Sequence, residues 1–326
     1  MTAWSLLDLA QIGTNETALD SFNVSVTLAR RAETGGLTRV WYAEHHNMPS
    51  IASSATSVLI AHIAAHTTTI RLGAGGVMLP NHAPLLIAEQ FGTLETLHPG
   101  RIDLGLGRAP GSDQATMRAL RRDAHSADRF PADVAELQGY LTGNSHIPGI
   151  QAVPGNATNV PLYILGSSTF GAQLAAKLGL PYAFASHFAP RALLEAVALY
   201  RKQFQPSDQL ASPYVIAGMN VIAAADRTQA QARLQATRRA RVRMLFKGMN
   251  DLNDAELDTV LDSPAGAQVD EMLRYTTVGD SAEVAGQIDA FAEHARADEV
   301  ILALADVSRD DALESFDRVA TIYESR

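Results

Sequence analysis

Residues 162–176 have the sequence Leu-Tyr-Ile-Leu-Gly-Ser-Ser-Thr-Phe-Gly-Ala-Gln-Leu-Ala-Ala, and they contain one complete unit of the predicted fold. The first four residues are apolar or aromatic, which predicts a short buried strand. The turn Gly166–Thr169 follows, and the alanine-rich stretch after it has helical spacing. A buried strand followed directly by a helix is the repeating unit of a parallel α/β sheet.

The same unit recurs along the whole chain. The predicted strands are Ser5–Leu9, Arg39–Tyr42, Ile70–Gly73, Ile102–Leu106, Leu162–Leu165, Tyr182–Ala185, Tyr214–Ala223 and Glu299–Leu304. Helical patterns follow each of them, for example at Thr56–His66 and Pro84–Leu97. Eight alternations in 326 residues fit a closed (β/α)8 TIM barrel better than an open doubly wound sheet. We therefore predict an α/β fold with residues 1–326 as a single barrel domain.

Two segments exceed what eight units need. Residues 143–160 are rich in Gly, Pro and Asn, and they predict a long loop before the fifth strand. Residues 226–278 contain more than one helical pattern, and we predict a helical insertion between strands seven and eight. Four arginines in this insertion are interpreted as a solvated helix face without a function: Arg238, Arg239, Arg241 and Arg243.

Composition excludes several classes of function. Lys and Arg number 26 against 35 Asp and Glu, so the formal charge of −9 argues against nucleic-acid or anionic-membrane binding. No cysteine is present, which excludes disulfides, thiolate metal sites and cysteine nucleophiles. The first basic residue is Arg30, and the longest apolar stretch is shorter than the ~18 residues of a membrane span. These features predict a cytoplasmic protein that acts on small molecules.

Catalytic groups in such barrels lie at the carboxyl ends of the strands. The second strand is followed by Ala43-Glu-His-His46, which places imidazoles there as candidate general acids or bases. Alternation along an extended chain predicts that only one histidine faces the barrel interior. A hydrogen-bonded structural histidine is an equally good interpretation.

Glycines mark the end of the third predicted strand, at Gly73, Gly75 and Gly76. They suit either a backbone that approaches a flat ligand or a simple turn. Asn81 and His82 follow in a loop, and we expect both at the surface.

Anion-binding groups follow strands four and five. Arg108 ends the fourth strand and suits a phosphate or a carboxylate. The glycine spacing there is G-x-G-x-x-x-G with Pro110, which argues against a Rossmann pyrophosphate loop. Gly166, Ser167 and Ser168 precede a helix N-terminus, a common anion site, although an ordinary N-cap is the alternative interpretation. Taken with Arg108, we predict a phosphate site.

No metal site is predicted. His62 and His66 are four residues apart, but no glutamate lies between them as in H-E-x-x-H, and they lie far from a strand end. Packing or surface exposure is the preferred interpretation for both.

The motifs together resemble the bacterial luciferase-like flavin monooxygenases, and they occur in the family's order along nearly the whole chain. The matching runs are Trp41–His46, Ile70–Pro84, Ala88–Gln90, Pro99–Arg108, Leu165–Ser168 and Gly179–Pro181. The resemblance implies a (β/α)8 barrel that binds reduced FMN and activates O2 as a flavin C4a-hydroperoxide. This species would transfer one oxygen atom to a small organic substrate. It also implies a separate NAD(P)H-dependent flavin reductase as a partner.

Residue roles also follow from the resemblance. His45 matches the active-site histidine, and Gly75-Gly76 matches a non-proline cis peptide that shapes the flavin pocket. Arg108 and Arg129 match phosphate-contacting arginines, and the strand-five phosphate loop corresponds to Gly166, Ser167, Ser168 and Gly171. Luciferase itself has a reactive cysteine where this chain has Gly107 and a glutamate where it has Ser167, so we do not predict light emission.

Two other functions stay open. One branch of the superfamily uses the deazaflavin F420 for hydride transfer, and a non-catalytic flavin-binding subunit would share the fold. The apolar helices Thr56–His66 and Pro84–Leu97 resemble the family's dimer face, so we expect a homodimer. No side-chain pattern identifies the substrate.

Overall fold

A computed structural model describes residues 2–109, 113–123 and 125–326, so Pro110 of the rejected Rossmann loop lies outside the described residues. Eight parallel strands form a closed barrel in which β1 pairs with both β2 and β9, and β9 pairs with β7. These strands are β1 (Ala3–Asp8), β2 (Arg39–Tyr42), β3 (Arg71–Met78), β4 (Ile102–Gly107), β5 (Leu162–Gly166), β6 (Tyr182–Phe184), β7 (Val215–Ala223) and β9 (Glu299–Leu304). The predicted (β/α)8 barrel is confirmed.

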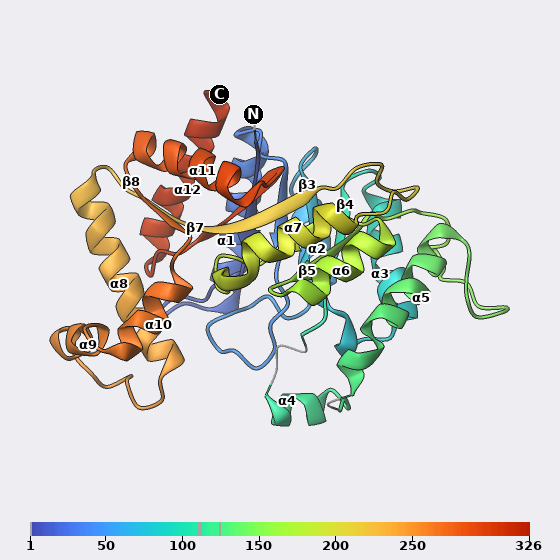
Figure 1. The fold of residues 1–326 in the computed structure, drawn as a ribbon, viewed down its shortest axis with the longest axis horizontal. Coiled ribbons are helices and arrows are strands. Elements are labelled where there is room, and N and C mark those ends of the chain that lie inside the picture. Colours follow the sequence, from blue (N-terminus) through green and yellow to red (C-terminus); the bar gives the residue numbers. More distant parts are fainter. Residues whose placement is uncertain (1, 110–112, 124) are drawn as a thin grey trace.

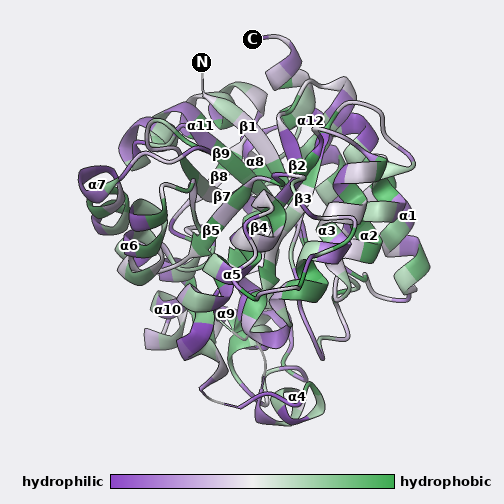
Figure 2. Ribbon diagram, turned by 90° about the vertical axis from the view of Figure 1, so that its right-hand side faces the viewer, coloured by the Kyte–Doolittle hydropathy of each residue, from purple (hydrophilic) through white to green (hydrophobic). Residues whose placement is uncertain are grey.

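Helices surround the barrel (Figure 1). They are α1 (Ala18–Thr34), α2 (Thr56–Ala64), α3 (Pro84–Leu97), α4 (Gln114–Ala119), α5 (Phe130–Thr142), α6 (Thr169–Leu178), α7 (Leu193–Gln203) and α12 (Arg309–Glu324), with short 3-10 turns at Leu79–Asn81, Ser126–Arg129 and Pro190–Ala192. Hydrophobic colour is concentrated on the central strands, and hydrophilic stretches lie on the outer helices (Figure 2). No helix in the described part of the chain is long and apolar enough to cross a membrane.

The insertion after β7 contains three helices: α8 (Arg227–Leu245), α9 (Asp254–Leu261) and α10 (Pro264–Met272). They pack around a small apolar core of their own, which includes Val242, Leu257 and Val269. This confirms the predicted insertion. α11 (Ser281–Ala295) follows, and it begins with a capping box in which the Asp280 side chain accepts from the N–H groups of Ala282 and Glu283.

Three features differ from the prediction. A ninth strand, β8 (Thr276–Gly279), pairs with Asn220–Ala223 of β7 where we expected only insertion helices. Its sequence Thr-Thr-Val-Gly is too short and polar to show a strand pattern. Helix α4 has no counterpart among the predicted helices, and β3 continues five residues beyond the predicted Gly73, through the glycines, to Met78.

The barrel interior changes in character from one end to the other. At the amino end, Arg39 donates to Asp103 at 2.7 Å and to Glu299 at 2.9 Å, and it also bonds the Tyr163 hydroxyl. Above this buried ion network lies an apolar cluster that includes Leu7, Trp41, Tyr163, Ile216 and Ile301. The layer nearest the carboxyl end consists of small residues such as Ala43, Gly75, Gly107 and Gly218. Large side chains therefore fill the amino end of the barrel interior, and the inward-facing strand residues become small near the carboxyl end.

Candidate functional site

Two histidines lie at the carboxyl end of the barrel interior. Ala43 belongs to the interior cluster, so alternation places His45 on the same inward side. His187 follows β6, and its Nδ1 occupies the space above Gly218, where a methyl group would come within 2.3 Å of it. The Nδ1 atoms of His45 and His187 are buried, and neither has a hydrogen-bond partner in the described chain. Each ring therefore has an unused nitrogen at the barrel mouth.

Burial favours the neutral form of both imidazoles. Burial lowers the pKa of His45, and the nearby His46 acts in the same direction against the attraction of Glu44. Burial lowers the pKa of His187 to about 4, with further repulsion from Arg241 and His45. A neutral imidazole can accept a proton on its free nitrogen and return it in a later step, so this environment fits the general base part of the role predicted for His45.

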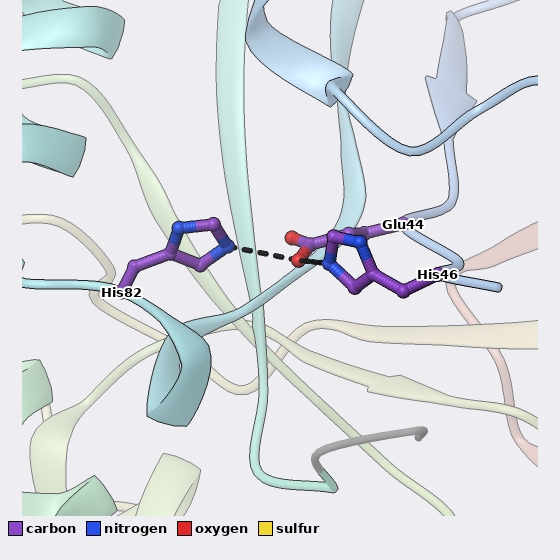
Figure 3. A group of neighbouring side chains, drawn as sticks. All are labelled: Glu44, His46 and His82. Atoms are coloured by element: carbon purple, nitrogen blue, oxygen red, sulfur yellow. Dashed lines mark hydrogen bonds and ion pairs between the residues drawn. The ribbon is translucent and has the colours of Figure 1, made fainter. Parts of the chain in front are cut away.

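Glu44 organises a second cluster, in which its carboxylate lies between the rings of His46 and His82 (Figure 3). Its Oε1 accepts from His46 Nε2 at 2.7 Å and from His82 Nε2 at 2.8 Å, while Oε2 accepts from the backbone N–H of Met78 at 3.0 Å. Glu44 is only 2% exposed. The expected surface position is wrong for Asn81, which is buried. His82 is half-buried, and its ring bonds this carboxylate.

The cluster of Glu44, His46 and His82 has two chemical interpretations. The ligand atoms lie within 4.8 Å of one another, and two imidazoles with a carboxylate suit a transition metal. However, each carboxylate oxygen already accepts a hydrogen bond, and this accounts for the geometry. We therefore interpret the cluster as a clamp that joins the end of β2 to the end of β3 and orients the segment carrying His45.

The strand-five loop presents polar groups without partners. Ser168 is the N-cap residue of α6, but its hydroxyl makes no capping hydrogen bond, and the first turn has no acidic residue. Ser167 and Ser168 are exposed, and Gly166 and Gly171 let the backbone of the turn fold closely on itself. The ordinary N-cap interpretation is thus not supported. The N–H groups and hydroxyls at this helix N-terminus could hold an anion.

Arg108 lies beside that helix N-terminus. Its guanidinium lies 4.2 Å from the ring centre of Phe170, in the first turn of α6, and its Nε donates to Ala127 O at 3.4 Å. Arg129 is two residues beyond Ala127, is largely exposed, and bonds Asp133 at 3.3 Å. The structure therefore brings together the predicted Arg108 and strand-five loop, with Arg129 nearby. This donor set suits a phosphate group.

The glycine pair forms part of the barrel wall. Gly75 and Gly76 are joined by a cis peptide, as the resemblance implied. A methyl group on Gly75 would lie 2.9 Å from Leu7 and Trp41, and one on Gly76 would lie 2.7 Å from Gly105 O. Both residues are partly exposed. Only backbone fits at these positions, which leaves a smooth wall of the kind that a flat ring system can approach.

Sequence reasoning missed several groups at this end of the barrel. His187 lies two residues after the predicted sixth strand, so the rule that identified His45 could also have identified it. The arginines of α8 were expected as a solvated face, and this is wrong. Arg238 pairs with Asp270 at 2.8 Å, Arg239 pairs with Asp254 at 2.7 Å, and Arg243 lies 3.6 Å from Asp254. Most of this face therefore holds the insertion together.

Comparisons with known proteins agree with this arrangement. The family model of luciferase-like monooxygenases matches residues 3–299. A luciferase-like monooxygenase of Escherichia coli (strain K12) is 46% identical over 325 residues, which cover 99% of this chain and 97% of that protein. An N-acetyl-S-alkylcysteine monooxygenase of Bacillus subtilis (strain 168) is 40% identical over 190 residues, which cover 57% of each protein.

Among solved structures, apo-MsnO8 superposes with a TM-score of 0.88 at 33% identity, and the match covers 99% of both chains. The barrel, its insertion and the residues at its carboxyl end thus occur in a chain that matches one family over nearly its full length. The protein belongs to the luciferase-like monooxygenase family.

Proposed function

We propose that this protein is a monooxygenase that uses reduced FMN and O2 to add one oxygen atom to a small organic substrate. The observation that carries the proposal is the approach of Arg108 to the uncapped N-terminus of α6, which brings a guanidinium close to a helix end suited to an anion. Family membership supports the monooxygenase class. His45 and His187 follow other strands at the same end of the barrel, so they would supply groups that can accept protons near a flavin ring bound there.

Each part of the site has a separate task in this proposal. Arg108, Arg129 and the Gly166–Gly171 turn, including Ser167 and Ser168, bind the phosphate. Gly75 and Gly76 form the wall against which the ring system lies, and His45 holds or transfers a proton next to it. Bound reduced flavin would supply the two electrons that activate O2. The protein's own contribution is to position the reactants, exclude water and control the protons.

Two partners complete the proposal. The glycine spacing after β4 does not match a dinucleotide-binding loop, so we propose that a separate NAD(P)H-dependent flavin reductase supplies the reduced FMN. We also propose a homodimer formed through α2 and α3. Large apolar side chains on these helices are exposed: Val58 by 68%, Leu86 by 54% and Leu97 by 63%.

Anaerobic titration with reduced FMN tests the binding step. We expect binding to the wild type, and we expect Arg108→Ala to weaken it by about tenfold or more, because a charge-assisted contact with phosphate is lost. Arg30→Ala is the matched control, since Arg30 is an exposed arginine on α1. Unchanged affinity in Arg108→Ala would contradict the assigned phosphate site.

Rapid mixing of the reduced complex with O2 tests the chemistry. A transient absorbing species between reduced and oxidised flavin, altered in His45→Ala, would support oxygen activation. FMN binding without any such transient would favour the non-catalytic flavin-binding subunit. If reduced FMN does not bind but reduced F420 does and is oxidised by an organic substrate, the hydride-transfer alternative replaces the proposal.

A further inference from the structure

One face of α8 lies across the carboxyl ends of the last barrel strands. Arg233 donates to Ala223 O at the end of β7, and the Thr237 hydroxyl donates at 2.9 Å to Ala305 O, just beyond β9. Residues four apart lie on the same helix face. Arg241 is the next residue in this series, so it extends from the barrel-facing side of α8 toward the mouth.

Arg241 differs from the other arginines of this helix. Arg233 pairs with Asp311 at 2.9 Å, and Arg238 and Arg239 each pair with acidic residues of α9 or α10. Among the residues that the structure describes, Arg241 has no carboxylate partner. Its Nη1 donates to Met244 Sδ at 3.5 Å, a weak contact, and its Nε is buried without a partner. A partly buried guanidinium with unused donors is suited to bind an anion from outside the chain.

The neighbours of Arg241 connect it with the histidines of the candidate site. Its positive charge is close enough to help lower the pKa of His187, after the larger effect of burial. His187 in turn interacts with His45, and Asn220 Nδ2 holds the His187 backbone at 2.6 Å from β7. The phosphate donors at Arg108 and α6 belong to other strands, β4 and β5, and bind a separate group in the proposed function.

We propose that Arg241 binds a carboxylate of the organic substrate, so that the protein acts on organic acids and the insertion helix α8 selects them. This inference rests on the proposed function for the reaction itself, but the binding step is independent of it. The guanidinium would hold the carboxylate at the rim, and the rest of the substrate would extend inward past His187 toward His45. Substrates without an anionic group would lack this anchor.

Calorimetric titration of the whole protein with straight-chain carboxylates from butyrate to octanoate, each compared with its primary amide, tests the inference. We expect at least one acid to bind about tenfold or more tightly than its amide, because a charge-assisted bidentate contact is absent from the amide. Arg241→Gln should remove this preference and leave amide binding unchanged, while Arg241→Lys should retain part of it. Equal binding of every acid and its amide to the wild type would overturn the inference.

Two further measurements separate this site from the flavin site. Hexanoate should raise the pKa of His187, followed by its imidazole NMR signals, because a bound carboxylate cancels the positive charge of Arg241. Arg238→Gln, on the same helix but already paired with Asp270, should keep the acid preference.

Reduced FMN should bind equally well to Arg241→Gln, and loss of FMN binding in this variant would overturn the inference by assigning Arg241 to the flavin. Failure of the wild type to bind FMN would instead contradict only the proposed function, since the carboxylate titrations need no flavin.

Discussion

Glu44 is a buried carboxylate that joins the end of β2 to the end of β3, because its oxygens accept from His46, His82 and the Met78 N–H. Burial alone would raise its pKa, but hydrogen bonding and charge from His82, with the Met78 and His46 hydrogen bonds, hold the pKa below its usual value. The Glu44 hydrogen bonds therefore stabilise its ionised form in the folded protein. The group acts on the reaction indirectly, by fixing the chain on both sides of His45.

Glu44→Gln tests this role. The amide would keep one acceptor oxygen and place an N–H group opposite a donor, so we expect the free energy of unfolding to fall by about 2 kcal/mol. Urea unfolding at neutral pH measures the change. Glu324→Gln, at an exposed position on the last turn of α12, is the control and should change stability little. Equal stability of the two variants would show that the clamp is unimportant.

His187 predicts a specific loss of stability in acid. Its pKa is about 4 in the folded protein and about 6.5 when unfolded, so between these values the unfolded chain binds a proton that the folded chain does not. Stability due to this group therefore falls as the pH drops from about 6.5 to about 4, by at most about 3 kcal/mol. In His187→Asn, the difference in unfolding free energy between pH ~7 and pH ~5 should be smaller than in the wild type. An unchanged difference would contradict the assigned environment.

At the scale of elements, two helical glycines predict opposite effects of the same substitution. Gly92 of α3 packs on the loop before β5, and a methyl group there would lie 2.1 Å from Gly155 Cα. Gly286 of α11 has open space within 4 Å. Gly92→Ala should lower the unfolding free energy by about 2 kcal/mol or more through this clash, whereas Gly286→Ala should raise it by roughly 0.5–1 kcal/mol through helix propensity. Thermal or urea unfolding distinguishes the two, and the same sign in both would refute the packing argument.

The βα units could be predicted because each is determined by a short local pattern. Leu162–Leu165 and Glu299–Leu304 are apolar runs of strand length, and the structure places β5 and β9 there. β8 could not be predicted in this way, because its four residues become a strand only by pairing with Asn220–Ala223 of β7. The predicted end of β3 at Gly73 was also wrong, because the strand continues through Gly75 and Gly76 to Met78.

The candidate site was predictable to the extent that it follows strand ends. This rule found His45, Arg108 and Ser167–Ser168, and the contact between Arg108 and Phe170 confirms that the last two regions meet. His82 and Arg241 could not be found, because their positions depend on how a loop and an insertion pack against strands distant in sequence. Such packing has no local sequence signal.

At the scale of the whole molecule, the exposed apolar side chains of α2 and α3 predict the oligomeric state. Val58→Glu combined with Leu86→Glu should convert the proposed dimer to a monomer, because burying two carboxylates in each copy's interface costs several kcal/mol. Sedimentation velocity measures the change. Val307→Glu, at a position that is 55% exposed near the start of α12, should leave the dimer intact. A wild type that sediments as a monomer would refute the proposal.

The pairing of β1 with β9 also has a consequence for synthesis. Ala3–Leu7 is synthesised long before its partner Glu299–Ala303, because almost the whole barrel lies between them in the sequence. At about 5–20 residues per second, the nascent chain spends tens of seconds with an open sheet edge on β1. Arg39 also lacks its Glu299 partner during that time. Chaperone binding to the growing chain should therefore persist until the final strand emerges, and ribosome-bound chains truncated before residue 299 should remain sensitive to protease.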